Sequence, residues 1–302
     1  MLFLDEIDKA LWKELYGNCR LSYQYLADKL EVSATAIRKR IDRLIERGVI
    51  VEWTISLAPA MIDCQFAFVE VNTEESHDSE YLFKEFYDRP EIFVILPLTT
   101  GDYALHVVYS GAEGLFELGS FIRQLDGVKE TKIHPTLVDN GTKIELGGLQ
   151  KRVLKSLIKD PRMSIAEVAN ESGLTARRVR KIIDQLIKSN AFIFDFTWNP
   201  NAGERLAFLA RIEYDSRIAT SESIEMKLRT DYNLEFFYSH VSAIEPVMFS
   251  LFMVNHLFDM EKIVKDLRMI SGVKTLRPLI YYSATVVAPP TTTRLQELLS
   301  EN

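Results

Sequence analysis

The side chains most able to do chemistry in this sequence are basic ones, gathered in two stretches at 33–47 and 175–188. Lysine and arginine bind DNA phosphates, and arginine also reads guanine edges through paired hydrogen bonds. Charge alone would favour a solvated helix face, since such helices are common in proteins that bind nothing. The residues predicted to contact DNA are Ser33, Thr35, Arg38, Lys39 and Arg43 in the first stretch, and Thr175, Arg177, Arg178, Arg180 and Lys181 in the second.

Residues suited to catalysis or metal binding are few and scattered. Cys19 and Cys64 are too few for a disulfide framework and lack zinc-site spacing, which suits a reducing cytoplasm. The five histidines show no ligand spacing, and no nucleophile-elbow or phosphate-loop pattern occurs. The sequence therefore predicts no catalytic residue, no metal site and no cofactor. With no long apolar stretch, it also predicts a cytoplasmic protein without a membrane segment.

An internal repeat places both basic stretches in equivalent positions. Residues 26–50 align with residues 168–192 at a constant offset of 142, with apolar positions coinciding throughout. Arg20 aligns with Arg162 in the same way. Turn-forming residues at 139–148 mark the join between the copies. The chain therefore reads as two fused copies of one two-domain unit.

Each basic stretch is predicted to be the third helix of a helix-turn-helix. Ser33 and Thr175 are expected to cap these helices, and apolar residues at helical spacing follow each cap. A short helix and a short turn precede each cap, which is the arrangement that major-groove insertion requires. The β-rich stretches 49–57 and 192–198 follow and are predicted to form small wings. Cap, turn and repetition together favour DNA binding over a merely solvated face.

Charge is distributed unevenly along the chain. The formal net charge is −7, which by itself gives no sign of a nucleic-acid binder. Residues 1–58 hold nine basic and nine acidic side chains, whereas residues 145–200 hold ten basic and six acidic. The net charges of these segments are thus 0 and +4, leaving −11 for the remainder. Negative assembly domains beside neutral or basic heads would orient the molecule on DNA.

The rest of each copy reads as strand, helix, strand, strand, helix, strand, the ferredoxin-like order. Gly101-Asp102 is a two-residue hairpin signal, whereas the second copy has Glu245-Pro246, so that hairpin should be edge-like or differently shaped. Residues 285–294 read as an extended tail before a short helix. The fold class is therefore α+β, with winged helix-turn-helix domains at 1–58 and 145–200, ferredoxin-like domains at 62–138 and 205–287, and a tail at 288–302.

The combined motifs resemble the Lrp/AsnC family of regulators, whose units join a winged helix-turn-helix to a RAM (regulation of amino-acid metabolism) domain. They are LDEIDKALWKEL, RLSYQYLADKLEVS, IRKRIDRLIERGVI, the GDY turn and LDGV. The resemblance implies a transcriptional regulator that binds double-stranded DNA, self-associates through its RAM sheets as a homodimer or larger assembly, and responds to an effector, often an amino acid. The effector position falls on Thr100, Gly101, Asp102 and Tyr103.

The sequence departs from the family pattern at three points, and two alternative functions remain open. Glu31 occupies the turn position where Gly173 stands in the second copy, Ala104 replaces a second acid, and the second copy lacks the GDY turn, so an effector pocket is expected in the first copy only. One alternative function is that of an enzyme similar to siroheme decarboxylases, with His240 and His256 around a strand pair, although the Cys-Tyr-x-Arg element of those enzymes is missing. The other alternative is a protein-interaction module that binds no DNA.

Overall fold

The computed structural model describes residues 4–199 and 206–300, which form two units. The head unit contains residues 4–64, 140–199 and 288–300, and the sheet unit contains residues 65–139 and 206–287. The two helix-turn-helix regions therefore share one unit, and the two ferredoxin-like regions share the other. The predicted boundaries at 200 and 205, and the predicted helix end at 301–302, lie outside the described residues.

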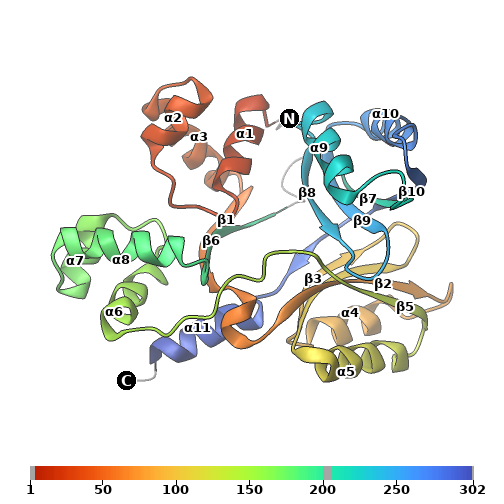
Figure 1. Ribbon diagram of the computed structural model, residues 1–302, viewed down its shortest axis with the longest axis horizontal. Coiled ribbons are helices and arrows are strands. Elements are labelled where there is room, and N and C mark those ends of the chain that lie inside the picture. Colours follow the sequence, from red (N-terminus) through yellow and green to blue (C-terminus); the bar gives the residue numbers. More distant parts are fainter. Residues whose placement is uncertain (1–3, 200–205, 301–302) are drawn as a thin grey trace. The chain divides into compact units, whose positions relative to one another are not determined.

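The head unit holds two copies of a three-helix domain, each followed by a strand (Figure 1). These copies are called the first head and the second head. The first copy consists of α1 (Glu6–Leu15), α2 (Tyr23–Leu30), α3 (Ala34–Glu46) and β1 (Ile50–Leu57), with the short 3₁₀ helix η1 (Pro59–Ile62) after it. The second copy consists of α6 (Gly148–Leu157), α7 (Ile165–Ser172), α8 (Ala176–Lys188) and β6 (Phe192–Trp198).

Local side-chain chemistry sets the helix ends as the sequence predicts. The hydroxyl of Ser33 accepts the backbone N–H of Ala36 at 3.1 Å, and that of Thr175 accepts the backbone N–H of Arg178 at 3.4 Å. The turn before each third helix needs a left-handed residue, which is Gly173 at φ 65° in the second copy. Glu31 takes the same conformation at φ 55°, at a cost of about 1 kcal/mol relative to glycine.

The two stretches predicted to form wings are strands, but they do not pair within their own copies. β1 and β6 instead pair with each other as one antiparallel ribbon, in register from Glu52 opposite Thr197 to Leu57 opposite Phe192. Each copy contributes a single strand, so neither copy closes a hairpin of its own in the described residues. The ribbon joins the two heads because an isolated strand would leave its backbone N–H and C=O groups unpaired.

A reciprocal contact between the heads follows the repeat. The guanidinium of Arg20 donates to the carbonyl oxygens of Pro161 and Met163, and that of Arg162 donates to those of Cys19 and Leu21. Pro161 and Met163 lie 142 positions after Cys19 and Leu21, just as Arg162 lies 142 positions after Arg20. The two heads therefore meet through the same patch on both sides, as the subunits of a two-fold dimer do.

The C-terminal segment packs into the second head. Its helix α11 (Pro290–Ser300) begins earlier than the sequence suggests, directly after Pro289, since proline is well tolerated at the first helical position. Leu295 and Leu299 are buried in the apolar core of that head. The extended part is correspondingly shorter than predicted and contains the short strand β11 (Thr285–Val286), which pairs with β3 in the sheet unit.

The sheet unit holds the two ferredoxin-like copies in the predicted order (Figure 1). The first is β2 (Gln65–Thr73), α4 (Ser79–Tyr87), β3 (Ile92–Pro97), β4 (Tyr103–Tyr109), α5 (Gly111–Gln124) and β5 (Val128–Pro135). The second is β7 (Leu206–Tyr214), α9 (Ser221–Asp231), β8 (Phe236–Val241), β9 (Val247–Val254), α10 (Leu257–Arg268) and β10 (Val273–Ile280). The strand orders are β11-β3-β4-β2-β5 and β10-β7-β9-β8, all antiparallel.

Each sheet is apolar on both faces because its helices cover one face and contacts with the other sheet cover the second. In β2, Val69 and Val71 point to the helix-side core. Phe68 points to the opposite face, where its ring stacks on Phe249 of β9 with centroids 4.0 Å apart. The two copies are thus held together by aromatic packing within one chain.

The two central hairpins differ, and the first departs from the two-residue prediction. Gly101 donates its N–H to the carbonyl of Leu98 and takes φ 90°, which gives a three-residue loop. The second hairpin runs through residues 242–246 and connects β9 to the edge strand β8. Pro246 lies in the loop directly before β9, a central strand, where its missing N–H removes no hydrogen bond from the sheet. Among the described helices, none is long and apolar enough to cross a bilayer.

Candidate functional site

Basic side chains on the outer faces of α3 and α8 form the candidate nucleic-acid interface. The exposed members are Arg38 and Lys39 on α3, and Arg177, Arg178, Arg180 and Lys181 on α8. None of these six side chains forms an ion pair with any described residue. Their charges therefore remain available to an anionic partner, while the apolar face of each helix is buried in its own head.

Arg43, a member of the predicted DNA-contacting set, forms an ion pair with a neighbouring helix. Its guanidinium lies 2.7 Å from the carboxylate of Asp8, which is only 2% exposed, and Arg40 bonds to the same carboxylate and to Asp5. Asp8 needs these cations because a buried carboxylate without partners is strongly destabilising. Arg43 therefore connects α3 to α1 while its side chain stays 38% exposed, and its contact with DNA stays a prediction.

The second head has no counterpart of this ion-pair cluster. At the repeat offset, Gly147 and Gln150 replace Asp5 and Asp8, and the two arginine positions become Ile182 and Gln185. No acidic side chain of α6 therefore draws the α8 cations inward. The second head carries more free positive charge than the first because Arg177 and Arg178 stand at the positions of Thr35 and Ala36.

The predicted effector turn is internally bonded. The two carboxylate oxygens of Asp102 accept the backbone N–H of Thr73 at 3.0 Å and the hydroxyl of Thr100 at 2.9 Å. Thr73 also donates its hydroxyl to the carbonyl of Gly101 at 3.1 Å. Tyr103 is buried, donates its phenol to the carbonyl of Ser79, and has its pKa raised to about 12 by burial. Asp102 therefore ties the turn to the end of β2.

The end of the second copy borders this turn. Thr99, one residue before the predicted set, donates its N–H to the carbonyl of Ile280 at 2.8 Å, and Leu98 forms an isolated bridge with Tyr281. The two copies therefore meet beside the turn, within the sheet unit.

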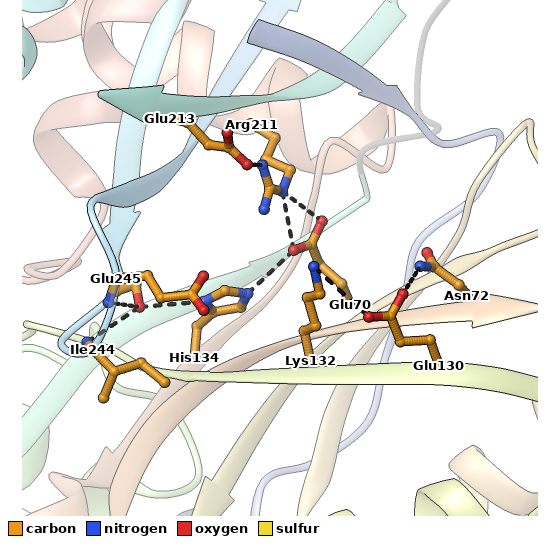
Figure 2. A network of polar contacts seen from close by, with 10 residues as sticks. Glu70, Asn72, Glu130, Lys132, His134, Arg211, Glu213, Ile244 and Glu245 are labelled. Carbon is orange, nitrogen blue, oxygen red and sulfur yellow. Dashed lines mark hydrogen bonds and ion pairs between the residues drawn. The ribbon is translucent and has the colours of Figure 1, made fainter. Parts of the chain in front are cut away.

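A polar network crosses between the two sheets (Figure 2). The guanidinium Nε of Arg211, on β7, lies 2.8 and 3.0 Å from the two carboxylate oxygens of Glu70, on β2. Glu70 also accepts from Nε2 of His134 at 3.1 Å, and Nδ1 of His134 lies 3.2 Å from the hydroxyl of Ser242. Burial acts to raise the pKa of Glu70, but His134 and Arg211 outweigh it and hold that pKa below its ordinary value. The network fixes the pairing of the copies by charge as well as by packing.

A histidine pair is the feature that sequence reasoning missed. His106 on β4 and His240 on β8 meet edge to face, with ring centroids 4.7 Å apart. Among the described atoms, Nε2 of His106 and both ring nitrogens of His240 have no hydrogen-bond partner. Burial lowers the pKa of both, that of His240 to about 4. The two residues are 134 positions apart in the sequence, so no local signal pairs them.

This pair makes the sheet unit sensitive to acid. Folding holds both imidazoles neutral, whereas the unfolded chain protonates them near pH 6.5, so their contribution is complete above that pH and is lost as the pH falls. At pH 5, His240 alone is expected to reduce stability by about 2 kcal/mol relative to pH 8. Thermal unfolding at both pH values should show a smaller acid-induced drop in Tm for His240→Leu than for the wild type. An equal drop in the two proteins would contradict the assignment.

Comparisons with known proteins agree with this geometry. A family model described as winged helix-turn-helix DNA-binding matches residues 4–51 and 148–190, one match in each head. The HTH-type transcriptional regulator LysM of Saccharolobus solfataricus is 31% identical over 127 residues, which are 42% of this chain and 84% of that protein. LrpA of Pyrococcus horikoshii is 29% identical over 141 residues, which are 45% of this chain and 96% of that protein.

A solved structure matches both copies together. The siroheme decarboxylase NirDL superposes with a TM-score of 0.58 at 12% identity, covering 98% of this chain and 99% of that one. At this identity the likeness concerns the fold, and it supports the arrangement of alternating helix-turn-helix and ferredoxin-like domains in tandem.

Two paired helix-turn-helix heads with outward basic helices define a DNA-binding regulator. The relatives specify the class further, since regulators of one copy in length match this chain over most of their own sequence. The chain belongs to the Lrp/AsnC family of HTH-type transcriptional regulators, in a tandem-duplicated form.

Proposed function

We propose that the chain binds double-stranded DNA through α3 and α8 together and regulates transcription from the cytoplasm. The observation that carries this proposal is the set of free cations at the same repeat positions of both helices, Arg38 with Arg180 and Lys39 with Lys181. The β1–β6 ribbon holds the heads together, so both helices approach a duplex as one body. Cations bind phosphates, and the helix starts offer side chains to base edges.

The first test uses Arg38→Ala combined with Lys39→Ala. Affinity for a recovered genomic DNA fragment should fall by roughly 1 to 3 kcal/mol if a base edge is lost, measured by fluorescence anisotropy at fixed salt. Lys84→Ala with Lys262→Ala is the matched control, because both side chains are exposed on helices of the sheet unit. Unchanged affinity in the first variant would remove α3 from the interface.

An effector site at the Thr100–Tyr103 turn is the second part of the proposal. A backbone turn with Gly101 suits a carboxylate, and Asp102 suits an ammonium group. Because Asp102 already bonds to Thr73 and Thr100, its replacement by alanine should cost about 1 kcal/mol of stability in addition to any ligand effect.

Asp102→Asn separates these two effects, since asparagine can still accept from the backbone of Thr73 while losing the charge. Calorimetry against the standard amino acids should detect binding to the wild type and at least tenfold weaker binding to this variant. Undiminished amino-acid binding by the asparagine variant would place the pocket elsewhere. The predicted self-association through the RAM-type sheets is measurable in the same samples by light scattering.

We propose regulation in preference to catalysis, because two relatives at 31% identity are regulators. The fold likeness to a siroheme decarboxylase keeps one enzymatic alternative. His240, named in that alternative, is buried beside His106, whereas His256 is exposed at the start of α10. An absorbance titration with siroheme should show no bound tetrapyrrole. A saturable spectral change would favour the enzyme.

A further inference from the structure

The two recognition helices differ where a helix start meets base edges. Aligned at the repeat offset, the first turn of α3 carries Thr35 and Ala36, whereas that of α8 carries Arg177 and Arg178. The next exposed positions are alike, as both helices have an arginine followed by a lysine there. The two helices therefore share their cations further along and differ at the residues nearest the caps.

These different residues favour different base pairs. The methyl groups of threonine and alanine suit contact with the thymine C5-methyl group, whereas arginine donates two hydrogen bonds to O6 and N7 of guanine. Thr35, Arg177 and Arg178 are exposed, and Ala36 is partly exposed. The α3 start therefore suits an A·T pair and the α8 start suits a G·C pair.

The architecture holds both helices in one unit. A homodimeric regulator presents the same helix twice and reads a palindrome, because its two-fold axis coincides with that of the DNA. Here the reciprocal Arg20 and Arg162 contacts and the β1–β6 ribbon reproduce a two-fold pairing inside one chain. The backbone symmetry survives while the reading residues have diverged.

Resting on the proposed DNA binding, we infer that the target of one chain is an asymmetric duplex with two unlike half-sites. The half-site under α3 contains a thymine contact, and the half-site under α8 contains a guanine contact. Inverted repeats of either half-site are bound less tightly than this mixed site.

The test is selection of the full-length protein against a library of randomised duplexes, with sequencing of the bound fraction. The wild type should enrich a non-palindromic site, and inverted repeats of either half should bind at least tenfold more weakly in a direct titration. Thr35→Arg with Ala36→Arg makes the first head resemble the second and should shift selection to an inverted repeat of the guanine half-site. Arg177→Thr with Arg178→Ala should shift it to an inverted repeat of the other half-site, at lower affinity.

Circular dichroism checks that both variants fold. If one variant does not fold, selection with the other still tests the inference. Enrichment of a palindrome by the wild type would overturn the inference while leaving the proposed DNA binding intact. Salt-sensitive binding of DNA without any enriched sequence would also overturn the inference and leave the proposed DNA binding intact. Absence of binding to any duplex would instead overturn the proposed function and the inference with it.

Discussion

Replacing Arg177, Arg178, Arg180 and Lys181 by alanine in one variant is expected to lower DNA affinity by roughly two to four orders of magnitude near physiological salt. These four cations are exposed on α8 and form no ion pair with the described residues, so nothing within the head neutralises them. Each phosphate contact that is lost removes about 0.9 from the slope of log K against log salt. The slope should therefore fall by up to about 3.6.

The matched control replaces four exposed lysines of the sheet unit, Lys84, Lys129, Lys262 and Lys265, which changes the net charge by the same amount. Its affinity and salt slope should stay close to those of the wild type. If both variants lost affinity equally, the binding would depend on net charge, and α8 would have no special role.

Arg211→Met is expected to destabilise the protein by roughly 3 kcal/mol. The arginine side chain is 2% exposed and lies between Glu70 and Glu213. Without it, Glu70, itself only 13% exposed, keeps His134 as its remaining partner in the network of Figure 2. The cost arises from leaving a buried carboxylate without its cation. Chemical denaturation followed by circular dichroism measures the loss.

A second substitution separates the charge from the packing. Combining Arg211→Met with Glu70→Gln removes the uncompensated carboxylate while keeping an acceptor for His134. The double variant should recover most of the lost stability, because the two positions are directly coupled. Equal losses in the single and double variants would show that the arginine acts by packing alone.

Local patterns predicted much of the fold. The caps at Ser33 and Thr175, the left-handed turn at Gly173 and the βαββαβ order all depend on residues close together in the chain. The repeat extended each of these features to the second copy and brought out the positively charged second head. The exposed positions of Arg38 and Arg180 follow from the helical spacing of the apolar residues around them.

Features that depend on distant residues could not be predicted in the same way. A β-strand pattern does not identify its partner strand, so the sequence carried no signal for the pairing of β1 with β6 across the two copies. The ion pair of Arg43 depends on Asp8, which lies in a different helix. The contact between His106 and His240 requires two sheets to pack face to face, and apolar alternation does not specify that pairing.

Site-specific photo-crosslinking tests the central claim most directly. A photoreactive residue placed at Arg38, at Arg180 or at the exposed Met226 of α9 would be irradiated in a complex with a bound genomic fragment. We expect crosslinks from the first two positions, at distinct places on the same duplex, and none from Met226. Retained DNA binding with no crosslink from either α3 or α8 would contradict it.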